Sequence, residues 1–348
     1  MFKNLLGKIS KDIGIDLGTS NSLFYVREKG IVINEPTYVA INTRTDQLLA
    51  VGIDAKKMMG KTPPHILVIT PIVNGVISDF EISEKLIKHW ISKIHKTSFS
   101  LTPRPRVVVS IPLDITEVER KAVQDAITSA GARQVHLIEE PIAAAIGARL
   151  NLQDSYGRMI VEIGGGKTSI AIISLSGIVS WQSLRIAGDE FDANIQSYIR
   201  ENFNVTIGKK AAEEIKIKIG SAMNLDEPLE LKVKGRNVLT GLPKEFTIND
   251  NQIREAMKRS VRTIVEYIRT TVENAPAELL TDLHESGILL SGGGALLRGF
   301  DKLTSKELQM PVHCVDDPLT TVVRGTGILL EDDNLLKEVE SLGNFALS

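Results

Sequence analysis

The 348-residue sequence has little of several features that would define a class of protein. Its single cysteine, Cys314, excludes an internal disulfide framework and any multi-cysteine metal site, and the six histidines show no metal-binding spacing. The formal net charge of −2 provides no basic field for nucleic acid. No run of about 18 apolar residues predicts a membrane-spanning helix. The 43% hydrophobic and 24% charged residues are the usual mix of a globular protein with room for two domains.

The first ten residues, MFKNLLGKIS, form an amphipathic pattern. Phe2, Leu5, Leu6 and Ile9 share one face of a helix, and the lysines lie elsewhere around it. The stretch is too short and too interrupted for a secretory signal peptide. Two interpretations are open: a leader that packs on the domain, or a short helix in a membrane interface. One such helix binds weakly, so a membrane would be held through polymerisation or a second contact.

Two stretches of the chain share one pattern, IGIDLGTSNSLFYV (13–26) and MIVEIGGGKTSIAII (159–173). Each has an apolar run, an acidic residue, an apolar residue, a glycine turn, a hydroxyl residue and a second apolar run. Asp16 and Glu162 occupy the same place in the two stretches, 146 residues apart. Two strand–turn–strand units at this distance predict two related halves.

Further elements follow each predicted hairpin. The strand-like VVVSIP (107–112) and a helix over roughly 115–131 follow the first, and Glu117, three residues after Asp114, predicts a capping box there. A helix near 251–273 and GILLSGGGALL (287–297) follow the second. Strands that alternate with helices predict mixed α/β domains rather than a sandwich.

Three glycine clusters carry the candidate chemistry. Glycine turns present backbone N–H groups to anions and allow a close approach to phosphate. Gly18 with Thr19 and Ser20 is predicted to cradle one phosphate group, and the second cluster, Gly164, Gly165 and Gly166, to do so from the other side. LSGGGALLRGF (290–300) predicts a third turn, from a strand into a helix, beside a base or a phosphate. Each cluster alone is explained as well by a tight turn, but all three in this order favour a nucleotide site.

Seven motifs resemble the superfamily of actin, sugar-kinase and heat-shock-chaperone ATPases, and within it the bacterial actins of the MreB/Mbl family. They are IGIDLGTSNS (13–22), ITEVERKAV (115–123), LIEEPIAAAIGA (137–148), EIGGGKTSIAIISL (162–175), AAEEIKIKIGSA (211–222), LLSGGGALLRG (289–299) and DDPLTTVVRGTG (316–327). They run in the family's order over nearly the whole chain. The EEPIAAAIGA and EEIKIKIGSA stretches are not features of sugar kinases or chaperones.

The resemblance implies an α/β fold of the actin-like two-domain ATPase type, with duplicated RNase H-like units around a nucleotide cleft. It implies a domain I of residues 1–145 plus 329–348, with a small subdomain at about 33–75. Domain II would take residues 146–328, with a small subdomain at about 185–250.

The resemblance also implies ATP or ADP with Mg²⁺ as ligands. Asp16, and Glu162 beside the second turn, would hold the metal through water, as a carboxylate beside each turn can. Glu140 would orient the attacking water, and its alternative is a helix N-terminal carboxylate favoured by the dipole. The implied nucleotide contacts are Gly18, Thr19, Ser20, Asn21, Gly164, Gly165, Gly166, Lys167, Thr168, Glu213, Lys216, Gly292, Gly293, Gly294 and Ala295.

Three of these residues have specific implied roles. Asn21 matches a position that senses the γ-phosphate or helps polymerisation. Glu213 and Lys216, three residues apart on one helix face, match a pair that contacts the ribose. The alternative for this pair is a surface ion pair, which contributes little to stability.

The second phosphate loop departs from the family pattern Asp-Ile-Gly-Gly-Gly-Thr-Thr-Glu at Glu162, Lys167 and Ser169, and the first two changes carry a prediction. Glu162 replaces the usual aspartate and reaches about 1.5 Å further, and Lys167 replaces a threonine whose hydroxyl positions water. An ammonium accepts no hydrogen bond from that water, but it attracts the β- and γ-phosphates as a point charge. We therefore predict retained nucleotide binding and a weak ATPase slowed by Lys167 and Glu162. A Lys167 side chain that points into solvent is the alternative.

The implied partners are further copies of the chain in filaments of paired protofilaments, other MreB paralogues, and the inner face of the cell membrane, from the cytoplasm. Residues 2–9 would contact lipid, with a second contact at Phe99 and Leu101 in KTSFSLTPRPR (96–106), or that segment is an ordinary surface loop. A small-molecule kinase of the same superfamily is the alternative function, but no catalytic constellation beyond Glu140 supports it. A chaperone-type ATPase would need a peptide-binding domain beyond Ser348.

Overall fold

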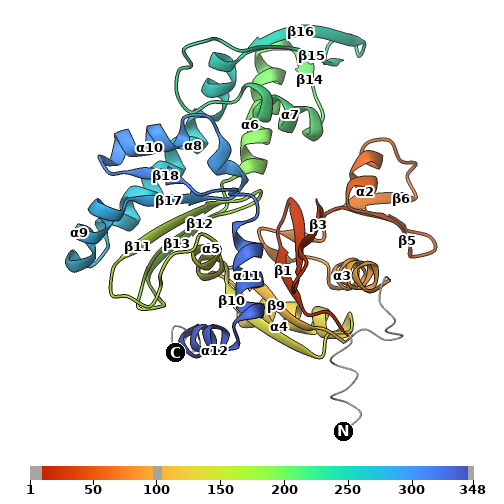
Figure 1. Cartoon of the computed structure of the whole chain (residues 1–348). Helices are drawn as coiled ribbons and strands as arrows, with labels where there is room; N and C mark the ends of the chain where they lie inside the picture. The colour runs from red at the N-terminus through yellow and green to blue at the C-terminus, as the bar shows by residue number, and fades with distance from the viewer. Residues whose placement is uncertain (1–9, 97–103, 344–348) are drawn as a thin grey trace. The chain divides into compact units, whose positions relative to one another are not determined.

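The structure, a computed structural model, describes residues 10–96 and 104–343 (Figure 1). The predicted amphipathic helix of residues 2–9 and the apolar pair Phe99 and Leu101 lie outside the described residues. No helix in the described part of the chain is both long and apolar enough to cross a bilayer. By packing, the chain divides into two compact units: unit 1 is Met1–Ser155, Ile173–Ile178 and Leu319–Ser348, and unit 2 is Tyr156–Ile172 and Val179–Pro318.

The elements of unit 1 are β1 (Ile13–Leu17), β2 (Asn21–Val26), β3 (Gly30–Pro36), β4 (Val39–Asn42), β5 (Gln47–Val51), α2 (Ile53–Met58), β6 (Ile66–Ile69), β7 (Ile72–Val73), β8 (Val76–Ile77), α3 (Phe80–His95), β9 (Arg106–Ile111), α4 (Glu117–Ser129), β10 (Gln134–Glu139), α5 (Glu140–Gly147), α11 (Thr321–Glu331) and α12 (Asp333–Gly343). Those of unit 2 are β11 (Arg158–Ile163), α6 (Gly188–Phe203), β14 (Val205–Thr206), α7 (Lys209–Ile219), β15 (Glu230–Asn237), β16 (Pro243–Asn249), α8 (Asp250–Glu273), α9 (Ala277–Ser286), β17 (Ile288–Ser291), a 3₁₀-helix (Gly293–Leu296), α10 (Phe300–Leu308) and β18 (Val312–Cys314). Strands β12 (Thr168–Ser174) and β13 (Gly177–Leu184) have residues in both units.

The main sheet of unit 1 has the strand order β10-β9-β1-β2-β3. Strands β1 and β2 form the predicted antiparallel hairpin, and β9 lies parallel to β1 and to β10. The apolar side chains of β1 and β9 are buried together with Trp90 and other residues of α3, while α11 also packs against both strands. Because helices cover a central parallel strand on both faces, its sequence is apolar almost throughout.

The main sheet of unit 2 repeats this arrangement, with the order β18-β17-β11-β12-β13. Strand β17 pairs parallel with β11 and with β18, as β9 does with β1 and β10. Strands β1 and β11 therefore correspond, and so do the two glycine turns that follow them. The predicted duplication into two related α/β halves is confirmed.

Several local predictions from the sequence can be compared with the structure. The helix predicted near 251–273 is α8, and the strand predicted at 107–112 is β9. The capping box predicted from Asp114 and Glu117 is wrong in register: Thr116 caps α4, and Glu119 closes the box. The small sheets β5-β4-β6 and β14-β15-β16 fall within the stretches predicted as small subdomains.

The C-terminal part of unit 1 begins at Leu319, earlier than the predicted boundary at 328/329. The reason is α11, which packs closely against α5. A Cβ atom on Gly147 would lie 1.8 Å from Thr321 O, and one on Gly325 would lie 1.8 Å from Ala143 O. Only glycine allows the two backbones to approach this closely. This contact fixes α5, whose first residue is Glu140.

Replacing Gly325 with alanine tests this contact. We expect Gly325→Ala to lower the free energy of unfolding by roughly 2–3 kcal/mol, because the added methyl group must push a backbone carbonyl aside. Chemical denaturation of the purified variant measures this loss. Gly177→Ala is the control, since its Cβ would lie at an ordinary 3.7 Å from Ser174 O, and equal stability of the two variants would contradict the close contact.

Candidate functional site

The first glycine loop, between β1 and β2 in unit 1, is held by hydrogen bonds to its carbonyl groups. Thr37 donates from Oγ1 to Gly18 O at 2.7 Å and from its backbone N to Ser20 O at 3.0 Å. The described peptides are all trans, so the C=O and N–H of one peptide point in opposite directions. The N–H groups of Thr19 and Asn21 therefore point away from Thr37, and they form the side of the loop that suits an anion.

Side chains from three parallel strands meet beside this loop. Asp16 is on β1, Ser110 is on β9, and Glu140 follows β10 as the first residue of α5. Burial and, to a smaller extent, the nearby Glu140 carboxylate raise the pKa of Asp16, a hydrogen bond with Ser110 opposes both, and the resulting pKa is about 7. Two carboxylates at the carboxyl ends of parallel strands suit a hard cation with oxygen ligands. Both interpretations of Glu140 stay open, because it lies at a helix N-terminus as well as beside Asp16.

The second glycine loop, between β11 and β12 in unit 2, is a tight turn in which Gly164 N donates to Lys167 O at 2.9 Å. The start of α6 holds its carbonyl groups: Gly188 N donates to Gly164 O at 3.2 Å, and Asp189 N donates to Gly165 O at 2.7 Å. By the same peptide geometry, the N–H groups of Gly165 and Gly166 point away from α6. This loop thus also presents amide donors on one side.

Lys167 and Thr168 end the second loop with buried side chains. Lys167 is only 7% exposed, so the alternative in which it points into solvent does not hold. Thr168 Oγ1 donates to Ile186 O at 2.7 Å, which ties the loop to the segment before α6. The Lys167 side chain is therefore held within the loop region, and its role toward phosphate stays a prediction.

The third glycine cluster packs directly against the second loop. A Cβ atom on Gly292 would lie 2.4 Å from Ile163 O, and one on Gly294 would lie 2.2 Å from Ile163 Cγ2. Gly292 also has a positive φ of 78°, which favours glycine. The cluster leads from β17 into the 3₁₀-helix Gly293–Leu296, and α10 begins at Phe300, so the predicted turn from a strand into a helix is present.

Helix α7 carries Glu213 and Lys216, and the structure places Lys216 in a contact that the sequence analysis missed. Lys216 Nζ lies 2.8 Å from Asp192 Oδ1 and donates to Gly188 O at 2.8 Å. Burial raises the pKa of Asp192 and Lys216 opposes that rise, so that the resulting pKa is about 6. One sequence signal could have found Asp192: it lies three and seven residues before Ile195 and Ile199, on the apolar stripe of α6. Thr37, Ser110 and Gly188 left no comparable signal.

The described residues contain no group of three or more His, Cys, Asp or Glu side chains placed to hold a metal ion. The residues predicted to contact metal and nucleotide fall into two sets, one in each unit. Unit 1 brings together Asp16, Gly18, Thr19, Ser20, Asn21 and Glu140, and unit 2 has Glu162, Gly164–Thr168, Glu213, Lys216 and Gly292–Ala295. Their roles toward a ligand stay predictions.

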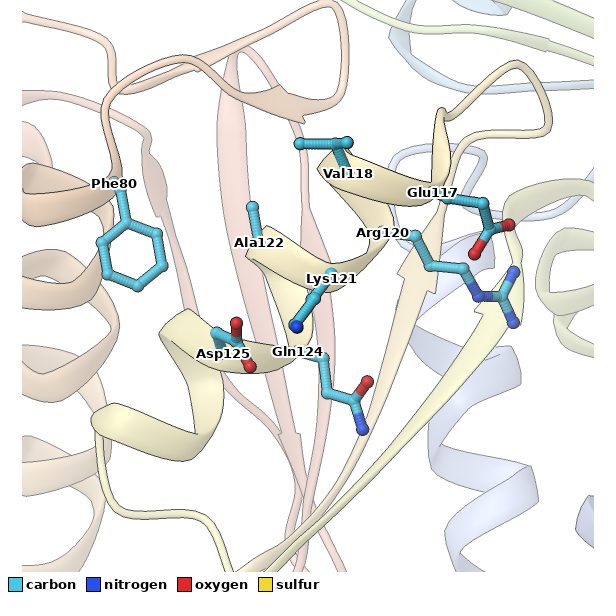
Figure 2. A pocket seen from close by; sticks show the side chains of 8 residues that line it. All are labelled: Phe80, Glu117, Val118, Arg120, Lys121, Ala122, Gln124 and Asp125. Carbon is cyan, nitrogen blue, oxygen red and sulfur yellow. The ribbon is translucent and has the colours of Figure 1, made fainter.

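A hollow of about 690 Å³ lies on unit 1, away from these loops (Figure 2). It is lined by Phe80 at the start of α3 and by the outward side of α4: Glu117, Val118, Arg120, Lys121, Ala122, Gln124 and Asp125. Val118 is 79% exposed, which is unusual for a large apolar side chain. None of the predicted nucleotide-contacting residues lines this hollow, so it is a separate surface feature.

A comparison with models of known protein families matches residues 10–338 to the family described as MreB/Mbl protein. The chain belongs to the MreB/Mbl family. The Cell shape-determining protein MreB of Escherichia coli (strain K12) is 48% identical over 337 residues, which cover 95% of this chain and 96% of that protein. The Cell shape-determining protein Mbl of Bacillus subtilis (strain 168) is 42% identical over 324 residues, which cover 93% of this chain and 96% of that protein.

Solved structures of this family have the same fold. MreB5 of Spiroplasma citri bound to ADP matches with a TM-score of 0.89 at 37% identity, over 95% of this chain and 98% of that chain. The same protein bound to AMPPNP matches with a TM-score of 0.89 at 38% identity, with the same coverage. The predicted actin-like fold and family are thereby confirmed. The chain is an actin-like cytoskeletal protein, and the small-molecule kinase alternative is not supported.

Proposed function

We propose that this member of the MreB/Mbl family binds an adenine nucleotide with Mg²⁺, hydrolyses ATP slowly and assembles into membrane-associated filaments. The observation that carries the proposal is the pair of equivalent glycine loops. In each loop the carbonyl groups accept hydrogen bonds on one side, so the N–H groups point to the opposite side. These are the N–H groups of Thr19 and Asn21 in the first loop and of Gly165 and Gly166 in the second. Amides arranged in this way bind phosphate. The ADP-bound and AMPPNP-bound forms of Spiroplasma citri MreB5 support this choice of ligand.

The residues around Asp16 fit a magnesium ion. Asp16 and Glu140 supply hard oxygen atoms, and a cation would relieve the repulsion that raises the pKa of Asp16. Glu162 is the corresponding carboxylate of unit 2. When bound, the ion would neutralise charge on the phosphates. The chain's own residues supply the rest: the loop amides bind phosphate, and Glu140 orients the attacking water from a helix fixed by α11.

The adenosine end is assigned to α7 and the third glycine cluster. Glu213 and Lys216 are proposed to lie near the ribose, with Gly292, Gly293, Gly294 and Ala295 beside the adenosine. The cluster's close packing on Ile163 supports this assignment, because it keeps the third loop next to the second. Asn21, at the start of β2, is the residue proposed to sense the γ-phosphate or to support polymerisation.

The hollow on α4 is the surface that we assign to the pairing of protofilaments (Figure 2). Val118 and Phe80 provide apolar contact area, and Arg120, Lys121, Glu117 and Asp125 provide charges of both signs. A surface of this composition suits another protein rather than lipid, because its acidic side chains oppose an anionic membrane. Other MreB paralogues would present a related surface, so mixed filaments are part of the proposal.

Membrane contact is proposed through residues 2–9, with Phe99 and Leu101 as a second contact. The described neighbours of these two segments support it. Ser10 Oγ accepts a hydrogen bond from Arg104 N at 3.0 Å and lies 3.3 Å from Nε2 of the buried His95. The two segments therefore leave the described part of unit 1 at one place, which would let them contact the same surface.

Lys167 is the residue with which we test the hydrolysis part of the proposal. We expect Lys167→Thr to raise phosphate release from ATP at least about tenfold, because a hydroxyl positions water and an ammonium does not. Lys167→Met is the matched control: it removes the charge without adding a hydroxyl, so it should weaken nucleotide binding without speeding hydrolysis. Turnover in the parent equal to that of Lys167→Thr would contradict the proposal.

Val118 is the residue with which we test filament pairing. Because the side chain is already 79% exposed, we expect Val118→Glu to change stability by less than about 0.5 kcal/mol, while electron microscopy with ATP shows single instead of paired protofilaments. Leu175→Glu is the control, since Leu175 is 61% exposed but lies outside the hollow. Paired filaments of Val118→Glu would exclude this surface.

Liposome co-sedimentation tests the membrane part of the proposal. We expect removal of residues 1–9 to lower the bound fraction on anionic vesicles, and Phe99→Ser with Leu101→Ser to lower it further, because each change removes apolar contact area. Ser10 is retained, so that its contacts with His95 and Arg104 stay in place. Unchanged co-sedimentation of the combined variant would show that these segments do not bind lipid.

A further inference from the structure

A buried ion pair in unit 2 joins helices α6 and α7 beside the second glycine loop. Asp192 lies on the core face of α6 with its side chain 4% exposed, and Lys216 reaches it from α7 with its side chain 18% exposed. The two charged atoms are 2.8 Å apart. A carboxylate this deeply buried is costly unless a cation lies beside it. The pair therefore fixes the Lys216 ammonium at one place.

That place is the carbonyl oxygen of Gly188, to which Lys216 Nζ donates at 2.8 Å. The carbonyl of Gly188 and the N–H of Asp189 belong to one peptide group, and Asp189 N donates to Gly165 O at 2.7 Å. The carbonyl of Gly165 in turn shares a peptide group with the N–H of Gly166. A chain of hydrogen bonds thus runs from Lys216, which its ion pair with Asp192 holds in place, through two peptide groups to an amide of the phosphate loop.

Such a chain has a direction. A cation at the Gly188 oxygen draws electron density along the peptide and makes the Asp189 N–H a stronger donor, and the same effect passes through Gly165 to the Gly166 N–H. Polarisation of this kind strengthens each hydrogen bond by about 10–30%.

Gly188 has little room for any other residue, since a Cβ atom there would lie 3.3 Å from both Gly164 O and Lys216 Nζ.

We propose that Lys216, held in place by Asp192, is a positioning residue that orients the second glycine loop and strengthens its amide donors toward phosphate. The inference rests on the proposed nucleotide site, and it deepens that proposal by placing the effect of Lys216 on the phosphates in addition to the ribose. Asp192 acts only through Lys216, and neither residue takes part in the chemical step.

A second lysine of α7 provides a matched control. Lys209 Nζ lies 3.0 Å from Asp189 Oδ1 and also joins α7 to the first turn of α6. Its side chain is 43% exposed and that of Asp189 is 32% exposed, so water screens this pair. Lys209→Met should therefore leave the loop unchanged, although it removes the same charge from the same helix.

The first experiment needs no nucleotide. Hydrogen exchange by mass spectrometry on the full chain follows the amides of Gly188 and Asp189 in a peptide covering residues 186–190. We expect Asp192→Asn and Lys216→Met each to speed exchange there roughly tenfold and to leave α8 unchanged, while Lys209→Met behaves as the parent. Exchange in this peptide equal to the parent for both variants would overturn the inference.

The second experiment compares two ligands, ADP by calorimetry and adenosine by NMR titration. We expect Asp192→Asn to weaken ADP binding by about tenfold or more and adenosine binding by less than about twofold. Lys216→Met, which also loses its place near the ribose, should weaken ADP binding more than adenosine binding, and the double variant should be no worse than Lys216→Met alone. If Lys216 serves only the ribose, Lys216→Met weakens both ligands equally and Asp192→Asn weakens neither, which overturns the inference.

A structural role alone would lower the affinity for both ligands together with the melting temperature, and this result also overturns the inference. If the charge variants fail to fold, Gly188→Ala perturbs the same peptide group without changing a charge. This variant should lower the affinity for ADP more than the affinity for adenosine. Equal losses of affinity for ADP and adenosine would contradict the inference. A parent that binds no ADP removes the proposed nucleotide site. The exchange experiment would then still decide whether Lys216 orients the loop.

Discussion

The hydrogen bonds that hold the carbonyl groups of the two glycine loops are the constraint on which the rest of this structure depends. A glycine-rich turn has many backbone conformations, and only a few of them direct several N–H groups to one side. Fixing the carbonyl groups from behind selects those conformations, since each trans peptide then has its N–H on the opposite side. The arrangement of amides that we propose for phosphate binding therefore comes from the donors behind each loop as well as from the loop's own residues.

The two halves of the chain meet this constraint in different ways. In unit 1 a single residue, Thr37, supplies both donors from its backbone and side chain. In unit 2 the first amides of α6 supply them, and a lysine from α7 contacts the same helix terminus. The first solution is local to a few strands, whereas the second connects the loop to two helices and a buried ion pair. Changes elsewhere in unit 2 can therefore reach the second loop through α6 and α7.

Charge placement in the two halves differs as well. Unit 1 concentrates negative charge, because burial and the nearby Glu140 carboxylate together raise the pKa of Asp16. Unit 2 has a buried lysine, Lys167, and a partly buried one, Lys216, which forms an ion pair with Asp192. The two units therefore differ in the sign of the charge that lies near their glycine loops.

The sequence by itself determined the family, the duplicated α/β halves and the positions of all three glycine loops, because apolar periodicity and glycine turns are local properties of the chain. It placed the capping box of α4 in the wrong register and did not find Thr37, Ser110, Gly188 or Asp192. Tertiary structure alone decided that Lys167 is buried, that Lys216 pairs with Asp192, and that Gly147 and Gly325 let two helices touch. Such contacts join residues that are tens to more than a hundred positions apart, and no local pattern records which of them will meet when the chain folds.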